Sequence, residues 1–333
     1  MVEPLQHPES PGFALDDAEA ADAPWLDEPE RREAVVSQDL HGQRLDKAVV
    51  AMAGEFSRTH LQGLIEHGHV LVDGVLAGSA SRKVLAGQTV SVELVPTAES
   101  RAFRPEPIPL AVVFEDEHLM VVNKRAGMVV HPAAGNWSGT LLNALLAHHK
   151  GAATLPRAGI VHRLDKDTTG LMVVGKTLPA VTALVRAIAA REVHRRYLAI
   201  VQGEVKPAAF SVEAPIGRDP KSRIRMAVVG TGKPARTDVQ VLACADGFSA
   251  LRCTLHTGRT HQIRVHMASR GHALVADTVY GGRAALGMER QALHAVQLGL
   301  VHPARPTEAA MLFEAELPAD LAQAWQQVAG GAR

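Results

Sequence analysis

The first strongly periodic part of the chain covers residues 37–95. Apolar positions recur with helical spacing in the stretch RLDKAVVAMAG, which begins at Arg44 and is broken at Gly54. A second helix is expected to begin after Ser57, a favoured N-cap residue, and to end at Gly68. The pattern therefore predicts two helices joined by a short turn.

A short sheet is expected after these helices. In HVLVDGVLA the dipeptide Asp73-Gly74 separates two apolar runs, which predicts a tight hairpin. Residues 84–94 alternate between apolar and polar positions, as a half-buried strand does. We interpret residues 37–95 as one small α/β domain and the breaker-rich residues 96–108 as a linker.

From about Pro109 the chain is rich in short strands with single helices between them. Hairpins mixed with isolated helices, without a regular strand–helix–strand repeat, are typical of α+β folds. We therefore expect residues 109–333 to form an α+β domain, with a mainly antiparallel mixed sheet and flanking helices. The expected elements are two strands around the acidic turn of VVFEDEHLMVVNK, helices in GTLLNALLAHH and LPAVTALVRAIAAR, a strand in RRYLAIVQG, a hairpin across Asp246-Gly247, and a helix that ends at Gly271.

One stretch of this part, residues 170–177, matches the phosphate-binding pattern GxxxxGK[ST]. Its four middle residues are Leu, Met, Val and Val, and such a run is typical of a buried strand, not of a turn that wraps phosphates. No apolar strand further along ends in an aspartate that could hold magnesium. We predict a buried strand here and keep nucleotide hydrolysis as an alternative.

The charge distribution divides the chain unevenly. Residues 1–36 hold ten acidic residues and two arginines, so their net charge is −8 and residues 37–333 carry +8. We interpret residues 1–36 as a disordered acidic leader. The basic remainder is suited to a polyanionic partner, with an ordinary charged surface as the alternative.

Three absences narrow the class of protein. No apolar run is long enough to span a membrane, and no secretory leader pattern begins the chain. The two cysteines form no CxxC pair, and the seventeen histidines show no metal-ligand spacing. The sequence therefore predicts a cytoplasmic protein without a disulfide framework or a metal site.

Candidate chemistry appears in HRLDKDTTG, residues 162–170, just before the apolar run. In an extended segment Arg163 and Asp165 share one face, while Leu164 points into the core. A nearby guanidinium favours and orients an ionised carboxylate, so Asp165 is a candidate nucleophile or base. A purely structural ion pair is the alternative, and Asp167 is expected to cap the following turn.

A second polar cluster occupies LHTGRTHQIRVH, residues 255–266. The chain is expected to turn at Gly258 and then to alternate, with Gln262 and Arg264 on one side and two aliphatic side chains on the other. A third cluster places Tyr197 directly after two arginines in VHRRYLAIVQG. Polar clusters at the ends of three apolar segments indicate a functional site more strongly than any one of them alone.

In this order the three clusters resemble the RluA family of pseudouridine synthases, and residues 37–95 resemble the S4 RNA-binding domain. The sequence of the longest matching stretch is most similar to that of the D-type members, which act on large-subunit ribosomal RNA. The family's usual residues are absent at Arg125, Gly175, Ala276 and Leu300, but none of these departures removes a polar catalytic group. The matching stretches are NKRAGMVVHP (123–132), HRLDKDTTGLMVVGKT (162–177), RRYLAIV (195–201), LHTGRTHQIRVH (255–266), ADTVYGG (276–282) and HAVQLGLVHP (294–303).

The resemblance implies an enzyme that isomerises uridine to pseudouridine in large-subunit (23S) ribosomal RNA or its assembling particle. It would act as a monomer, without a cofactor or metal, by base flipping and an aspartate-dependent rearrangement of the glycosidic bond. Asp165 would be the catalytic residue, Arg264 its partner, and Tyr197 the ring that stacks on the base. RNA or base contacts are expected from His162, Arg163, Lys166, Arg259, His261 and Gln262, and from Arg44, Lys47 and Arg58 of the S4-like domain.

Two other functions agree with the same residues. The chain could be a non-catalytic RNA-binding factor of ribosome assembly that uses the S4-like domain and the basic surface. It could also be a member of the same family that acts on other ribosomal or transfer RNA uridines.

Overall fold

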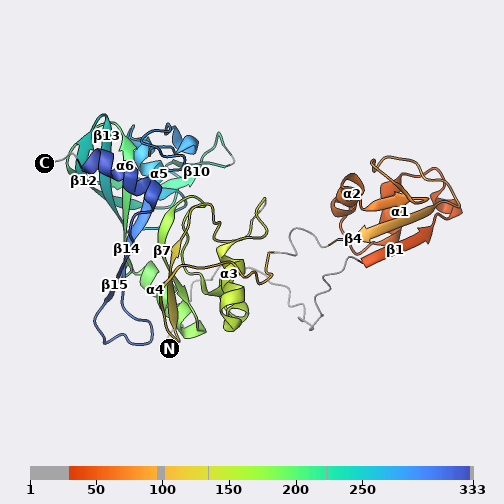
Figure 1. Cartoon of the computed structure of the whole chain (residues 1–333), viewed down its shortest axis with the longest axis horizontal. Helices are drawn as coiled ribbons and strands as arrows, with labels where there is room; N and C mark the ends of the chain where they lie inside the picture. The colour runs from red at the N-terminus through yellow and green to blue at the C-terminus, as the bar shows by residue number, and fades with distance from the viewer. Residues whose placement is uncertain (1–29, 96–101, 134, 223, 331–333) are drawn as a thin grey trace, which may run out of the picture. The chain divides into compact units, whose positions relative to one another are not determined.

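The computed structural model describes residues 30–95, 102–133, 135–222 and 224–330. The chain divides into two compact units, residues 1–97 and residues 98–333 (Figure 1). Each unit has its own hydrophobic core and is described by itself.

The first unit packs two short helices on a four-stranded sheet with the order β1-β4-β2-β3. The hydroxyl of Ser57 accepts a hydrogen bond from the backbone N–H of His60, which confirms the predicted cap of the second helix. The expected hairpin is present and turns at Asp73 and Gly74, both with positive φ. The elements are β1 (Glu30–Val35), a 3-10 turn η1 (Gln38–Leu40), α1 (Leu45–Met52), α2 (Arg58–Glu66), β2 (Val70–Val72), β3 (Val75–Leu76) and β4 (Thr89–Leu94).

Strand β1 corrects one prediction. Residues 30–35 were expected to belong to a disordered leader, but they pair antiparallel with β4 over their whole length. The side chains of β1 are exposed or half-exposed, so no apolar alternation marks the strand in the sequence. The rest of the predicted leader, residues 1–29, lies outside the described residues.

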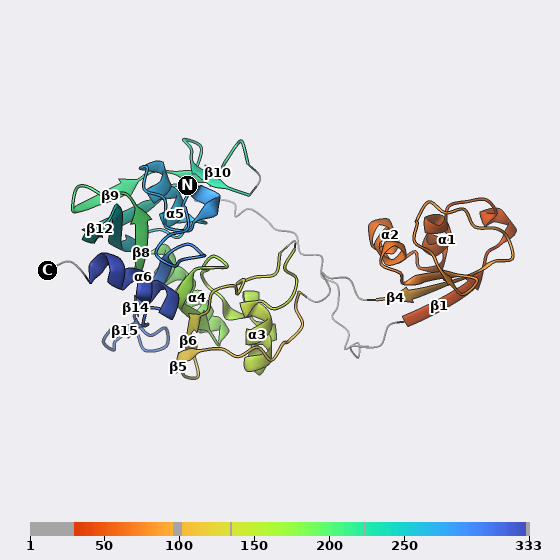
Figure 2. The same cartoon turned by 45° about the horizontal axis from the view of Figure 1, so that its top comes forward.

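The second unit is an α+β domain around a nine-stranded mixed sheet with the order β5-β6-β7-β14-β8-β13-β12-β9, in which β15 also pairs with β14 (Figure 2). Of the described pairings only β7 with β14 is parallel. A separate two-stranded ribbon is made by β10 and β11. The strands are β5 (Val112–Glu115), β6 (Leu119–Lys124), β7 (Thr169–Gly175), β8 (His194–Gln202), β9 (Ala209–Glu213), β10 (Ile216–Arg218), β11 (Met226–Val228), β12 (Arg236–Ala245), β13 (Phe248–Leu255), β14 (Leu293–Leu300) and β15 (Met311–Glu314).

Helices cover the sheet on both faces. On one face α3 and α5 contribute side chains to the main core, and on the other face α4 packs beside β7 and α6 packs across β12 and β13. The expected helices after Thr140 and Thr177 are present, and both threonines cap them with their hydroxyls. The helices are α3 (Leu141–His148), η3 (Lys150–Thr154), η4 (Pro156–Gly159), α4 (Leu178–Ala189), α5 (Gln262–Ser269), η5 (Thr278–Tyr280) and α6 (Ala319–Ala329).

Strand β7 lies in the middle of this unit. Met172 and Val174 pack into the main core, while Leu171 and Val173 pack into a second cluster under α4. All seven residues of β7 are buried, as expected of a central strand with both faces covered. The stretch that matches the phosphate-binding pattern is therefore a buried strand, which excludes a phosphate-binding loop at this position.

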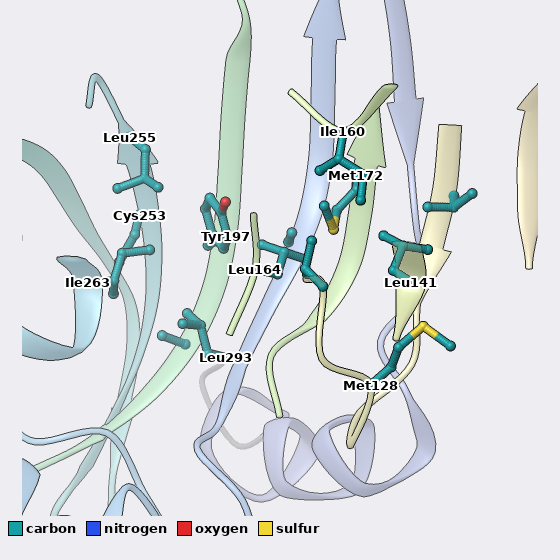
Figure 3. Packing of buried hydrophobic residues seen from close by; sticks show 14 of the residues in the cluster. Met128, Leu141, Ile160, Leu164, Met172, Tyr197, Cys253, Leu255, Ile263 and Leu293 are labelled. Carbon is teal, nitrogen blue, oxygen red and sulfur yellow. The ribbon is translucent and has the colours of Figure 1, made fainter. Parts of the chain in front are cut away.

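The segment after Gly258 is a second correction. It was expected to alternate as a strand before a helix, but Gln262 already begins helix α5. Residues 262–267 are all buried, so the helix has no polar face whose spacing the sequence could reveal. The main core reaches this helix through Ile263 and reaches the loop before β7 through Leu164 (Figure 3).

Gly170 is the second residue of β7 and pairs with Ala295 of the parallel strand β14. Its φ is +114°, and a Cβ atom at this position would collide with the backbone O and N of Ala295 on β14. Gly127 has a comparable positive φ of +79°, but a Cβ atom there would meet nothing within 4 Å. A side chain at Gly127 would meet backbone strain alone, whereas a side chain at Gly170 would meet both strain and a collision.

We predict that Gly170→Ala lowers the free energy of unfolding of this unit by about 2–6 kcal/mol, because strain and collision add. Gly127→Ala, the matched control, carries the strain alone and should cost about 1–2 kcal/mol. Urea unfolding followed by tryptophan fluorescence measures both, since Trp137 and Trp325 lie in this unit. Equal losses for the two variants would contradict the close approach at Gly170.

Candidate active site

The predicted polar clusters meet at one cavity of the second unit, with a volume of about 330 Å³. Its walls come from the loop before β7, from β8, from the end of β13 and from the start of α5. A second hollow of about 390 Å³ shares the loop of Asp165 with the first. Asp165 and Arg264 line both hollows.

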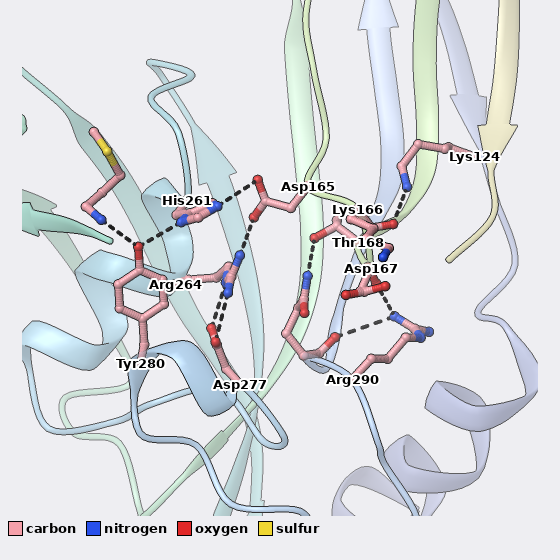
Figure 4. Close-up of polar contacts among 12 residues, drawn as sticks. Lys124, Asp165, Lys166, Asp167, Thr168, His261, Arg264, Asp277, Tyr280 and Arg290 are labelled. Atoms are coloured by element: carbon pink, nitrogen blue, oxygen red, sulfur yellow. Dashed lines mark hydrogen bonds and ion pairs between the residues drawn. The ribbon is translucent and has the colours of Figure 1, made fainter. Parts of the chain in front are cut away.

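The loop that carries Asp165 is fixed at several points. Leu164 is 5% exposed and packs into the main core, as predicted, while Arg163 and Lys166 on either side are exposed. The backbone carbonyl of Lys166 accepts a hydrogen bond from the Lys124 ammonium at 2.9 Å. The carbonyl of Asp167 accepts one from the Arg290 guanidinium, also at 2.9 Å (Figure 4). The aspartate therefore sits on a short loop whose backbone is held from both sides.

The carboxylate of Asp165 is paired with Arg264, 99 residues further along the chain. Arg264 Nη1 donates to Asp165 Oδ2 at 2.9 Å. The other carboxylate oxygen, Oδ1, faces His261 Nε2 at 3.7 Å, beyond hydrogen-bond length. Asp165 thus has one oxygen occupied by a guanidinium and one oxygen without a close donor among the described residues.

Arg264 is in turn held by a second carboxylate, Asp277. Its Nε and Nη2 donate to the two oxygens of Asp277 at 2.7 and 2.9 Å in a bidentate pair. Burial opposes the charge of the guanidinium, but the hydrogen bonds that Arg264 donates to Asp277 and the charges of Asp165 and Asp277 outweigh it, so the pKa of Arg264 is raised. Arg264 is therefore a permanent, oriented cation inside the protein.

Two tyrosines border the site in different ways. Tyr197 lies on β8 among apolar residues and lines the cavity, and burial raises the pKa of its hydroxyl (Figure 3). That hydroxyl makes no hydrogen bond with the described residues. Tyr280 lies behind the site: its ring is 5.0 Å from the Arg264 guanidinium, and its oxygen is 2.8 Å from His261 Nδ1.

The remaining predicted contact residues of this unit divide into two groups. Arg163 and Lys166 are exposed near Asp165, while Arg259 is half-buried and its Nε donates to the carbonyl of Pro234. His261 lines both hollows. These four side chains are accessible to a bound RNA.

His162 and Gln262 also line the cavity, and their polar atoms are bonded mainly inside the protein. His162 Nε2 accepts the N–H of Val173, and its Nδ1 is buried without a partner among the described residues. The Gln262 amide bonds Thr257, Thr237 and backbone groups, so its donors and acceptor are used inside the protein. Both residues brace the site from within.

The basic residues predicted on the first unit gather around one buried carboxylate. Arg44 and Arg58 both donate to Asp46, and Lys47 donates to Gln43. Hydrogen bonds from Arg44, and to a smaller extent from Gln62 and Arg58, outweigh burial and lower the pKa of Asp46. The guanidinium groups remain about half exposed and can contact a partner.

Four residues of the site were not among the predicted site residues, namely Lys124, Asp277, Tyr280 and Arg290. Asp277 and Tyr280 lie in ADTVYGG, and Lys124 lies in NKRAGMVVHP, so each belongs to a stretch already singled out by similarity. Arg290 carries no such signal. Its role follows only from the fold, which brings it to the loop of Asp165.

Among the described residues, no group of three or more His, Cys, Asp or Glu side chains could hold a metal ion. None of the helices in the same ranges has the length and hydrophobicity of a membrane span.

Residues 118–269 match the RNA pseudouridylate synthase family, and residues 43–90 match the S4 domain. Among solved structures, human RNA pseudouridylate synthase domain containing 1 has a TM-score of 0.51 and 25% identity, and the likeness covers 67% of this chain and 86% of that one. The fold and the family match therefore define an RNA-modifying isomerase with an S4 domain.

Relatives along nearly the whole length are also found. Ribosomal large subunit pseudouridine synthase D of Nitrosomonas europaea is 47% identical over 304 residues, which are 89% of this chain and 87% of the relative. The protein of the same name from Neisseria meningitidis serogroup B is 47% identical over 299 residues, 86% of this chain and 79% of the relative. The chain belongs to the family of RNA pseudouridine synthases.

Lys124 allows a test of how the loop is held. The side chain is 2% exposed and its ammonium donates to three carbonyls, those of Arg125, Met128 and Lys166. Burial lowers the pKa of Lys124 from 10.5 to about 8, against the opposing charges of Asp167 and Asp165. Between these two values the unfolded chain binds more protons at this residue than the folded one, so the lysine makes stability rise with pH.

We predict that the unfolding free energy of the wild type, minus that of Lys124→Met, rises by about 3 kcal/mol between pH 7.5 and 11. Taking the difference removes the contributions of the other titrating groups. Urea unfolding of both proteins at several pH values measures it. Parallel pH profiles would show that Lys124 titrates normally and that its ammonium is not buried as described.

Proposed function

We propose that this enzyme isomerises uridines to pseudouridine in large-subunit ribosomal RNA, the substrate that the names of its relatives indicate. The observation that carries the proposal is the state of Asp165. Its Oδ2 is bonded to a buried arginine, its Oδ1 has no close donor among the described residues, and the residue lines a cavity of about 330 Å³. A carboxylate presented in this way suits the cleavage of a glycosidic bond.

The reaction breaks the N1–C1′ bond of uridine, turns the uracil and joins C5 to C1′. Asp165 either attacks C1′ or removes a proton from the sugar, and both routes need one free, ionised carboxylate oxygen. Because Arg264 occupies Oδ2, Oδ1 is the oxygen that acts. No electron, phosphate or other group is consumed, so the chemistry requires no cofactor.

The target base is extruded from the RNA and enters the cavity beside Tyr197. Unstacking costs a few kcal/mol, and contacts in the pocket must offset it. The Tyr197 ring lies in the wall of the cavity, where it can stack on the uracil, and its hydroxyl is available for proton transfer at C5. Arg163 is exposed beside Asp165, and its planar guanidinium can fill the gap that the base leaves.

The remaining RNA is held through its backbone. Lys166, Arg259 and His261 contact the target strand near the cavity, while Arg44, Lys47 and Arg58 of the S4 unit contact phosphates elsewhere. We assign residues 37–95 to this RNA-binding domain together with strand β1, residues 96–108 to a linker, and residues 109–333 to the catalytic domain. The enzyme acts in the cytoplasm, as a monomer, on the RNA or its assembling particle.

Release of tritium tests this function, because C5 of the uracil loses its hydrogen only when it bonds to C1′. Wild-type protein is expected to release tritium from ribosomal RNA labelled at uridine C5. Asp165→Asn, which keeps the shape but not the charge, should reduce release by about 1,000-fold or more, with RNA affinity within about threefold of wild type. Asp116→Asn is a matched control, because Asp116 also pairs with a histidine and an arginine, His302 and Arg305, and lines neither hollow.

Two results would count against the proposal. Substantial release by Asp165→Asn would remove the aspartate from the chemistry. Tight RNA binding by a wild-type protein that releases no tritium from any ribosomal or transfer RNA would favour the non-catalytic alternative. Release from transfer RNA alone would keep the enzyme and reject the ribosomal substrate.

A further inference from the structure

A chain of polar groups leads from strand β11 to the free oxygen of Asp165. The backbone N–H of Met226 donates to the Tyr280 hydroxyl oxygen at 3.0 Å. The same oxygen lies 2.8 Å from His261 Nδ1, and His261 Nε2 faces Asp165 Oδ1 at 3.7 Å (Figure 4). Tyr280 has no part in the reaction proposed above, yet it is 7% exposed and its oxygen bonds His261, which faces Oδ1.

The protonation state of His261 decides what this chain can do. The charged groups around the imidazole are Asp165, Arg264, Asp277 and Arg163. Burial is the largest effect and lowers the pKa of His261, although the neighbouring carboxylates oppose it. The ring is therefore neutral at neutral pH, so only one of its two nitrogens carries a proton.

The two tautomers differ in what they present to Asp165. With the proton on Nδ1, the lone pair of Nε2 would point at the carboxylate oxygen, and the two would repel each other. With the proton on Nε2, an N–H points at that oxygen and attracts it. The Asp165 anion thus favours the second tautomer.

Tyr280 favours the same tautomer from the other side. One lone pair of its oxygen is occupied by the N–H of Met226. Its own proton is then available to donate to His261 Nδ1, which must be unprotonated to accept it. All the hydrogen bonds of the chain then run in one direction, from β11 towards the active site.

We propose that Tyr280 is a positioning residue of the reaction, which fixes His261 as the Nε2–H tautomer and thereby aims Oδ1 of Asp165 into the cavity. Arg264 holds Oδ2, and the histidine N–H restrains Oδ1 from a distance too long for a strong hydrogen bond. The orientation of Oδ1 is restrained in this way, while its lone pairs stay free to react. This role rests on the proposed function of Asp165, but the tautomer assignment does not.

Nitrogen-15 NMR of the histidine side chains in the full-length protein tests the tautomer directly. Two other histidines serve as internal references, because each bonds a backbone carbonyl that can only accept. His266 Nε2 bonds Ala214 O and so carries its proton on Nε2. His272 Nδ1 bonds Gln202 O and so carries its proton on Nδ1.

In the wild type we expect His261 to show the pattern of His266. In Tyr280→Phe, which keeps the ring beside Arg264 and removes only the hydroxyl, the His261 signals should shift towards the pattern of His272, and the two references should stay unchanged. Wild-type His261 with the pattern of His272, or no change in the variant, would overturn the assignment. This result does not depend on whether the protein has any activity.

Tritium release then tests the consequence for the reaction. Tyr280→Phe should lower kcat by about 5- to 20-fold and leave KM unchanged. The variant loses the orientation of Asp165 Oδ1 but keeps the contacts with RNA. In a His261→Gln background, whose amide can donate without a tautomer, the same change should add less than twofold. A kcat within twofold of wild type for Tyr280→Phe alone, or an equal loss in both backgrounds, would refute the positioning role while the wild-type activity upheld the proposed function.

Discussion

The structure of the site depends on one buried guanidinium that is shared by two carboxylates. Arg264 holds Asp277 with two hydrogen bonds and Asp165 with a third, and it is almost excluded from water. Removing an arginine and a carboxylate from water is costly, so such a group persists only when its donors are satisfied. Asp277 accepts from two of the five N–H donors, and a third, on Nη1, is directed at Asp165. Asp277 therefore offsets the cost of burying the Arg264 guanidinium, so that Arg264 can hold Asp165 inside the protein.

The rest of the unit serves to bring these residues together. Helix α5 carries Arg264 and is buried along its first six residues, so the guanidinium has little freedom to move. The loop of Asp165 precedes the fully buried strand β7 and is tied down by Leu164 in the core and by the cations of Lys124 and Arg290. Both elements rest on the same sheet, which fixes the distance between them. Rigid supports of this kind keep reacting groups oriented before the substrate arrives.

Much of the fold could be predicted from local patterns, and the misses have physical causes. Helix caps at Ser57 and Thr140 and the hairpins at Asp73 and Asp246 depend on neighbouring residues, which the sequence displays. Strand β1 is exposed and α5 is buried along its first six residues, so neither shows the one-sided alternation by which such elements are identified. The pairing of Arg264 with Asp165 spans 99 residues and was expected only through similarity. Asp277 and Tyr280 support the site from behind, and no spacing rule distinguishes such residues from structural ones.

A single-turnover rate measures most directly whether Arg264 orients Asp165. With Arg264→Gln in excess over labelled RNA, we expect the rate of tritium release to fall by about 100-fold or more, because a small misplacement of the reacting group has an effect of that size. RNA affinity should stay within about threefold of wild type, since Arg264 is buried and its donors face protein carboxylates. A single-turnover rate within twofold of wild type would show that Asp165 acts without this partner, and would contradict the account.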